Sequence, residues 1–333
     1  MYVLGFACFA LAVECARGVD GQRWMRTVWI AVAVLMSVVA TVMADLSNVY
    51  QQPLCGTGAA QHVFTHTPSE RLLFGAKVTF NEWNLFSSFL LIPFALGLWA
   101  WRRETAWQRV IVAALGAMVF GLVSGITRAA WLSMTGLIAL WWTLRRPRRR
   151  QVAALGLIVA GAFLVQALSL GGSPLWARFF EQRSNIEHRL AINRVAFQSW
   201  VGHPESEHAD RGLPVLTLLL GRGAGSVNRL SVVVPEGRLE RVWTGNVVLF
   251  VLQDSGLVGL ATLLGLVVVL LRRAARAIQR DAGGATSSFT VPLLASGAAL
   301  CFAYQFTHGL WLMYPYVYLG FLTAVTETGS DVA

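Results

Sequence analysis

The chain has 333 residues, of which 56% are hydrophobic and only 13% are charged, and its formal net charge is +10 at pH 7. A chain this apolar is unlike an ordinary globular domain and predicts an integral membrane protein. More than half of the 27 basic residues lie in four short stretches beside apolar runs. Membrane orientation and contact with membrane lipids therefore explain the charge, and nucleic acid is not an expected partner. The four cysteines are scattered, so neither a disulfide framework nor a metal site is predicted.

Nine apolar runs approach the length of about 20 residues that a helix needs to cross a membrane. They lie at residues 1–16, 28–44, 84–101, 107–124, 127–144, 151–169, 246–271, 288–306 and 309–326. The predicted fold is therefore all-α: a polytopic membrane helix bundle that forms one integral domain over residues 1–333. The first run begins at Met1 without a basic leader, so one possibility is that further N-terminal helices are missing from this chain.

Arginine clusters follow every second run and predict the orientation of the bundle. They comprise Arg17, Arg23 and Arg26, then Arg102, Arg103 and Arg109, then residues 145–150 apart from Pro147, and finally Arg272, Arg273, Arg276 and Arg280. Basic residues beside membrane spans stay on the inner side of the membrane. We therefore expect the clusters inside, and the long connections 45–83 and 170–245 outside.

The outer connection 170–245 contains a helical pattern. Apolar residues in its segment 176–201 recur at helical spacing, which is typical of one or two amphipathic helices lying along the membrane surface. Pro204 is expected to end this pattern, because proline cannot continue a helix. The connection 45–83 contains two prolines and shows no strong period.

Arg128 lies at the start of the fifth run, directly after a very short outer turn. A charge at a membrane boundary is unfavourable unless it is solvated or paired. Two interpretations stay open. Either the side chain extends to lipid headgroups, or its guanidinium binds phosphate oxygens with help from the N-terminal end of the helix that follows.

The outer connections hold further candidates for anion binding and proton transfer. Arg189 and Arg194 fall on adjoining turns of the predicted helix and are either solvated charges or additional anion ligands. His203 precedes Pro204, and His308 lies in a short hairpin between the last two runs. Histidine titrates near neutral pH and therefore suits the role of a general base.

The run Gly221-Arg222-Gly223-Ala224-Gly225 allows two uses. Backbone amides near Gly223 and Gly225 can approach a phosphate, as they do in anion-binding nests. The run lacks the lysine followed by serine or threonine that ends a P-loop. A flexible re-entry into the next span is therefore the favoured interpretation.

Four stretches of this chain resemble, in order, the motifs of the O-antigen ligase and O-antigen polymerase superfamily. Ser124–Trp131 is similar to the family's Ser-Arg-Gly-Ala-Trp-Leu type motif, with Arg128 in the arginine place. The others are Arg194–Pro204 followed by Leu220–Gly225, then Asn246–Gly259, and finally His308 with Tyr314 and Pro315. The likeness covers about residues 80–325.

The chain departs from the family pattern at three places. Gly245 stands where the family often has a histidine, and Leu312 and Met313 replace an acidic residue before Tyr-Pro. Residues 205–220 separate two motifs that are usually adjacent. The family's general base therefore has no counterpart at Gly245.

The resemblance implies a GT-C-like bundle in the bacterial inner membrane. Such a protein transfers a glycan from a polyprenyl-pyrophosphate carrier to a glycan, lipid A-core or protein acceptor at the outer face, without metal or cofactor. The residues implicated are Arg128, Arg194 and Arg189 for pyrophosphate binding, His308 and His203 for catalysis, and Asn246, Gly223 and Gly225 as further site residues. Two other functions stay open: a transporter or flippase for an anionic lipid or solute, and a catalytically inactive relative.

Overall fold

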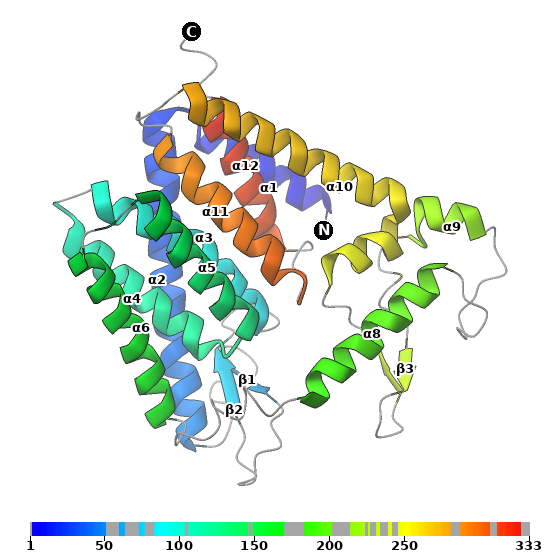
Figure 1. The fold of residues 1–333 in the computed structure, drawn as a ribbon, viewed down its shortest axis with the longest axis horizontal. Helices are drawn as coiled ribbons and strands as arrows, with labels where there is room; N and C mark the ends of the chain where they lie inside the picture. The colour runs from blue at the N-terminus through cyan, green and yellow to red at the C-terminus, as the bar shows by residue number, and fades with distance from the viewer. Residues whose placement is uncertain are drawn as a thin grey trace. The chain divides into compact units, whose positions relative to one another are not determined.

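The computed structural model describes residues 2–50, 60–63, 73–76, 83–103, 106–145, 147, 149–169, 183–201, 214–223, 226, 231–233, 239–241, 246–280, 287–306 and 312–327. These residues form eleven helices and two small antiparallel sheets (Figure 1). The helices are α1 (Tyr2–Cys15), α2 (Gly18–Tyr50), α3 (Trp83–Arg103), α4 (Gln108–Ser124), α5 (Arg128–Arg145), α6 (Arg149–Ser169), α8 (Arg183–Val201), α9 (Pro214–Leu220), α10 (Val247–Arg280), α11 (Ser287–Ala303) and α12 (Met313–Glu327). The strands are β1 (Ala60–Val63), β2 (Leu73–Ala76), β3 (Ser231–Val233) and β4 (Leu239–Arg241).

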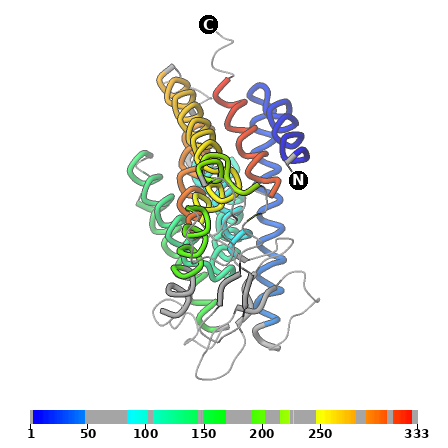
Figure 2. The backbone as a smooth tube through the Cα atoms, turned by 90° about the vertical axis from the view of Figure 1, so that its right-hand side faces the viewer, coloured from blue at the N-terminus to red at the C-terminus, as the bar shows by residue number. Residues whose placement is uncertain are grey.

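The chain divides into two compact units. Unit 1 comprises Met1–Glu181, Arg273–Ala303 and Trp311–Ala333, and unit 2 comprises Gln182–Arg272 and Tyr304–Leu310. Most of α10 therefore belongs to unit 2, and its last turns belong to unit 1. Within unit 1, α2 runs as one long helix from Gly18 to Tyr50 (Figure 2).

Helix α3 lies at the centre of unit 1. It contacts α2, α4, α5 and α11, and 94% of its apolar stretch is buried. Only 28% of the corresponding stretch of α2 and 22% of that of α6 are buried, although both are more apolar than α3. Apolar surface of this extent is unfavourable in water and suited to lipid. The bundle therefore packs around α3 and presents its peripheral helices to the membrane.

Small residues allow α4 to approach its neighbours closely. A Cβ atom on Gly121 would lie 2.6 Å from the Ser37 hydroxyl of α2, and one on Gly125 would overlap the Ser87 hydroxyl of α3. Glycines four residues apart are a recurring device for close helix packing in membranes, where dispersion contacts drive association. Larger residues at either position would push α4 away from α2 and α3.

Helices α1 and α12 pack against each other over their length. Phe6 and Tyr316 meet edge to face with ring centroids 6.1 Å apart, and Gly5 leaves room for the Tyr316 ring. On the other helix, Gly320 lies against the Phe9 carbonyl and the Ala12 side chain. The two helices thus form a tightly fitted pair within unit 1.

Each of the nine predicted spans overlaps a helix in the described part of the chain. Four of these helices are long and apolar enough to cross a membrane: Gly18–Ser47, Asn84–Trp101, Arg149–Leu168 and Val247–Gln279. Three shorter apolar helices accompany them, at Val3–Cys15, Gln108–Ser124 and Phe289–Ala303. These four helices confirm the prediction of a multi-pass membrane protein.

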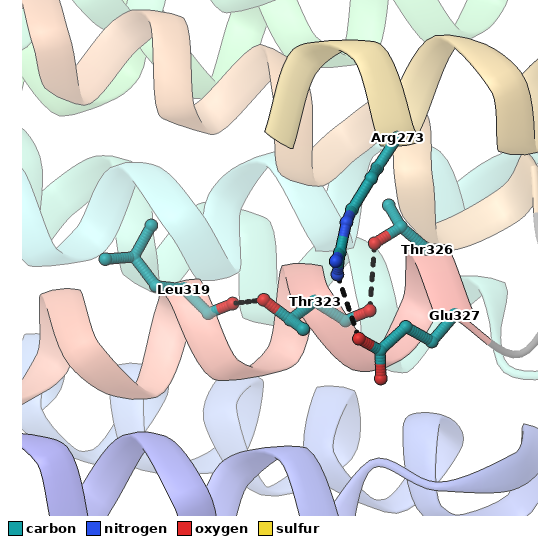
Figure 3. A network of polar contacts seen from close by, with 5 residues as sticks. All are labelled: Arg273, Leu319, Thr323, Thr326 and Glu327. Atoms are coloured by element: carbon teal, nitrogen blue, oxygen red, sulfur yellow. Dashed lines mark hydrogen bonds and ion pairs between the residues drawn. The ribbon is translucent and has the colours of Figure 1, made fainter. Parts of the chain in front are cut away.

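Arginines of all four clusters, which were predicted to lie in loops, are part of helices, and two of these helices extend well beyond the predicted spans. Helix α2 begins at Gly18 rather than at residue 28, so it includes Arg23 and Arg26. Helix α10 continues to Arg280, because arginine is a good helix former and a cation favours a helix C-terminus. Near this end, Arg273 Nη1 donates a hydrogen bond to Glu327 Oε1 at 2.9 Å, joining α10 to α12 (Figure 3).

The connections contain two short hairpins that the sequence does not predict. Strands β1 and β2 pair in antiparallel register, with Ala60 opposite Ala76, and lie against α2. Strands β3 and β4 pair with Ser231 opposite Arg241. Part of the stretch 176–201, predicted to be helical, forms α8, which ends at Val201, before Pro204. Within the described residues, the four helices long enough to span a membrane are continuous apart from a break in α10 at Gly256.

Candidate functional site

The two ends of unit 1 differ in chemistry. At one end the Arg26 guanidinium lies 5.6 Å above the Phe289 ring, and Trp101 stacks on Trp141 with centroids 5.9 Å apart. The opposite end carries a cluster of uncharged polar groups and one carboxylate, which we call the polar end. Its members are Thr41, Asp45, Asn84, Ser124, Thr127 and Gln166.

One buried amide joins three helices at the polar end. Gln166 Nε2 of α6 donates to Asp45 Oδ1 of α2 at 2.8 Å and to Ser124 Oγ of α4 at 2.9 Å. Ser124 Oγ in turn lies 3.3 Å from Thr41 Oγ1. Gln166 and Ser124 are almost completely buried. Buried polar groups are stable only when they are hydrogen-bonded, so this network fixes α2, α4 and α6 relative to one another.

The turn between α4 and α5 is strained. Ile126 is fully buried and has a φ of 50°, a conformation that β-branched residues rarely adopt. Thr127 Oγ1 lies 3.0 Å from both Asn84 Oδ1 and the Gly125 carbonyl oxygen, and it can donate to either. Trp131 Nε1 donates to the Leu122 carbonyl oxygen at 2.8 Å, which ties the next turn of α5 back to α4. Strain of this kind persists only where the surroundings enforce it.

Arg128 follows this turn as the first residue of α5, with its side chain partly exposed. Among the described residues, no acidic side chain pairs with Arg128. The backbone N–H groups of Arg128, Ala129 and Ala130 also find no hydrogen-bond acceptor there, since the first helical bond runs from Trp131 N–H to the Thr127 carbonyl oxygen. A cation beside unpaired N–H groups at a helix N-terminus favours an anion. The site can therefore hold a phosphate or carboxylate group.

The remaining predicted ligands belong to unit 2 or lie outside the described residues. Arg194 is exposed on α8. Arg189 lies on the same helix, but its side chain is outside the described part, as are His203, His308 and Gly225. The structure therefore places Arg128 in one unit and Arg194 in the other.

Asn246 has a structural role that the sequence prediction did not identify. Its Oδ1 accepts hydrogen bonds from the N–H groups of Val248 at 2.9 Å and Leu249 at 3.1 Å. Its Nδ2 donates to Gln305 Oε1 at 3.3 Å. These contacts cap the N-terminus of α10. The side-chain oxygen of Asn246 is thus engaged in holding the helix.

The glycine run pairs with a break in α10. The backbone leaves helical geometry at Gly256, with φ 60° and ψ −160°. Arg222 N–H donates to the Gln253 carbonyl oxygen at 2.8 Å, and Gly223 N–H donates to that of Asp254 at 3.1 Å. Ser226 N–H donates to Asp254 Oδ1 at 3.1 Å. The N–H groups of Arg222 and Gly223 are therefore engaged with α10, which favours the re-entry interpretation over a phosphate nest.

Sequence reasoning missed Asp45 and Gln166 as members of the candidate site. Each is a polar residue near the end of an otherwise apolar run, and this is the signal that marks such positions for attention. Thr127 and Asn84 had only weak signals, because threonine and asparagine are common near helix ends.

Comparisons with known proteins do not extend this description. No known protein family, curated protein or solved structure significantly matches the chain. The geometry of the polar end and the motifs that surround Arg128 are therefore the features that indicate a function.

Proposed function

We propose that this protein transfers a glycan from a polyprenyl-pyrophosphate carrier to an acceptor at the outer face of the bacterial inner membrane. The observation that carries the proposal is Arg128, the first residue of α5, where the first N–H groups of the helix have no acceptor among the described residues. The resemblance of Ser124–Trp131 to a motif of the O-antigen ligase and polymerase superfamily supports the same function. The acceptor is a glycan, a lipid A-core or a protein.

The chemistry of the transfer accounts for the residue type at this position. An acceptor hydroxyl attacks the anomeric carbon of the glycan, and the bond to the pyrophosphate oxygen breaks. Negative charge grows on the departing pyrophosphate and must be stabilised by groups already in place. An arginine binds two phosphate oxygens in one plane and keeps its charge at every physiological pH. In this proposal Arg194 and Arg189 of α8 add positive charge, and His308 or His203 is the expected base.

The distribution of charge in unit 1 supports the orientation that the proposal needs. Arg26 and Arg273 lie at the end opposite to Arg128 and the polar end. If arginine-rich ends face the cytoplasm, the polar end faces outward, where lipid-linked glycans are transferred. The exposed apolar surfaces of α2 and α6 give the protein a lipid boundary.

The test uses purified protein in nanodiscs, with lipid-linked glycans extracted from bacterial membranes as donor and lipopolysaccharide core as acceptor. Turnover is followed as release of undecaprenyl pyrophosphate, and donor affinity as binding of undecaprenyl pyrophosphate itself. Replacement Arg128→Lys keeps the positive charge but cannot bind two phosphate oxygens in a bidentate manner, so we expect turnover to fall roughly 100-fold. Arg128→Ala should also weaken binding.

The matched control is Arg109→Lys, an exposed arginine at the opposite end of the adjacent helix α4. It should behave like the wild type. Normal turnover in Arg128→Ala, at a normal protein level, would show that Arg128 only contacts lipid headgroups.

A transporter or flippase for an anionic lipid is the second candidate, and one observation favours it. The break of α10 at Gly256 is an interrupted apolar helix, a feature that transporters use to build substrate sites. The carbonyl oxygens of Gln253 and Asp254 at this break are, however, occupied by N–H groups of the glycine run. Movement of labelled undecaprenyl pyrophosphate across proteoliposomes, without glycan transfer, would support the transporter.

A further inference from the structure

Asp45 is a carboxylate within an apolar helix. It lies in the stretch Gly18–Ser47, which is long and apolar enough to span a membrane, near the end of that stretch. Its side chain is only partly buried. Ionisable residues in such segments are unfavourable for stability and most often serve a function. Among the described residues, Asp45 is the only acidic side chain at the polar end.

Among the described residues, only one oxygen of this carboxylate accepts a hydrogen bond. Asp45 Oδ1 accepts the hydrogen bond from Gln166 Nε2 at 2.8 Å. No described residue donates a hydrogen bond to Oδ2. Because the Gln166 amide is almost fully buried and both its N–H bonds are used, the side chain of Asp45 is held in one position. Among the described residues, the second oxygen has no hydrogen-bond donor that would compete with an acceptor hydroxyl.

The same amide links Asp45 to the turn that carries Arg128. Gln166 Nε2 donates to Ser124 Oγ at 2.9 Å, and Ser124 is the last residue of α4. Arg128 follows four residues later, at the start of α5. Asp45 therefore belongs to a hydrogen-bonded cluster of unit 1 that includes the last residue of α4, four positions before Arg128. Both side chains retain some exposure.

We propose that Asp45 is the general base that activates the acceptor hydroxyl. This inference rests on the proposed glycan transfer. The hydroxyl proton moves to Asp45 Oδ2 while the acceptor oxygen forms a bond to the anomeric carbon of the donor glycan. The bond between that carbon and the pyrophosphate oxygen breaks, and the pyrophosphate leaves with the electron pair beside Arg128. Asp45 then releases the proton to water.

This assignment supplies a proton acceptor that the sequence lacks at Gly245, because glycine has no side chain to take a proton. It competes with a purely structural role, in which Asp45 serves only as an acceptor for Gln166. An asparagine separates the two roles, because its side-chain oxygen still accepts the hydrogen bond from Gln166 but does not take up a proton near neutral pH.

The experiment measures kcat, KM and undecaprenyl pyrophosphate binding for Asp45→Asn in nanodiscs with the donor and acceptor described above. We expect kcat to fall roughly 100-fold or more, with donor binding unchanged. Gln166→Leu keeps the Asp45 carboxylate but removes the hydrogen bond that positions it. A smaller loss of kcat is therefore expected. Asp20→Asn, at a fully exposed side chain near the other end of α2, is the matched control and should resemble the wild type.

A second variant tests proton transfer directly. Asp45→Ala lacks the carboxylate, and exogenous formate should restore part of its turnover if Asp45 acts as a base. Wild-type kcat in Asp45→Asn, or an equal loss in Asp45→Ala with and without formate, would assign Asp45 to structure alone. Loss of turnover in His308→Ala with normal turnover in Asp45→Asn would assign the base to the histidine. If the wild type neither binds undecaprenyl pyrophosphate nor releases it from the donor, the proposed function itself fails, and this inference with it.

Discussion

Thr127 illustrates how a single hydroxyl stabilises an unfavourable backbone conformation. Its Oγ1 reaches both Asn84 and the Gly125 carbonyl, and it follows Ile126, whose positive φ is unfavourable by about 1–3 kcal/mol. Removal of the hydroxyl leaves Asn84 Oδ1 without this partner. The turn would then lose one of the contacts that keep Ile126 in its strained conformation and Arg128 in its place.

Replacement Thr127→Val keeps the shape of the side chain and removes its hydroxyl. We expect a loss of about 1–2 kcal/mol in the free energy of unfolding, together with weaker binding of undecaprenyl pyrophosphate. The control is Thr135→Val on the same helix, since the Thr135 hydroxyl donates to the Trp131 carbonyl of the preceding turn and, among the described residues, to no other helix. Thermal unfolding in detergent and binding in nanodiscs measure both effects. Equal behaviour of the two variants would contradict a special role for Thr127.

At this scale the sequence predicted that Arg128 lies at the start of a helix, but it did not predict which residues surround it. The position of Arg128 follows from one apolar run ending and another beginning, which is local information. The contact between Gln166 and Asp45 joins residues that are far apart in the chain, and one glutamine in an apolar run does not indicate which helix it will meet. Such pairings depend on tertiary packing, and a single sequence carries little record of them.

At the scale of elements, the break in α10 depends on two glycines that face each other. A Cβ atom on Gly221 would lie 2.5 Å from the Asp254 carbonyl carbon, and one on Gly256 would overlap the Leu219 carbonyl oxygen. Both glycines also have a positive φ, which other residues adopt at an energetic cost. The backbone of the glycine run thus lies directly against the interrupted helix.

We therefore expect Gly221→Ala to lower the free energy of unfolding by about 1–3 kcal/mol. Gly265→Ala provides the control within α10, because a Cβ atom there meets nothing within 4 Å. Alanine favours the helix by roughly 0.5–1 kcal/mol over glycine, so this variant should be slightly more stable than the wild type. Thermal unfolding in detergent distinguishes the two. A stable Gly221→Ala protein would mean that the run and the break are not packed as described.

The helices themselves were predictable, and their interruptions were not. Long apolar runs with arginines at alternate ends predict nine helices, and all except α2 and α10 begin and end within a few residues of the predicted positions. Gly256 lies in the run 246–271, which predicts one continuous span. A single glycine does not indicate a break there, because glycines are common in membrane helices. Its break requires the partner Gly221, more than thirty residues earlier in the chain. The ends of α2 and α10 were also missed, since arginines extend a helix as readily as they end a span.

For the molecule as a whole, charge predicts which side faces the cytoplasm. The arginine-rich end of unit 1 should be inside, and the connection that contains α8 should be outside. On a background without native cysteines, Val201→Cys should react with an impermeant maleimide in intact cells, whereas Ala106→Cys, between α3 and α4, should react only after permeabilisation. Both positions are exposed. The opposite labelling pattern would reverse the orientation and remove the basis for an outer-face transferase.

The pairing of α1 with α12 has a consequence for how the protein is made. These helices lie near opposite ends of the sequence, so α1 is synthesised long before the surface that receives Tyr316 and accommodates Gly320 exists. Until α12 is synthesised, the face of α1 that packs against it is in contact with lipid or is shielded by other membrane components. Unit 1 therefore completes its packing only after α12 has been synthesised, and a nascent chain that stops before α12 leaves an unmatched helix for quality control to detect.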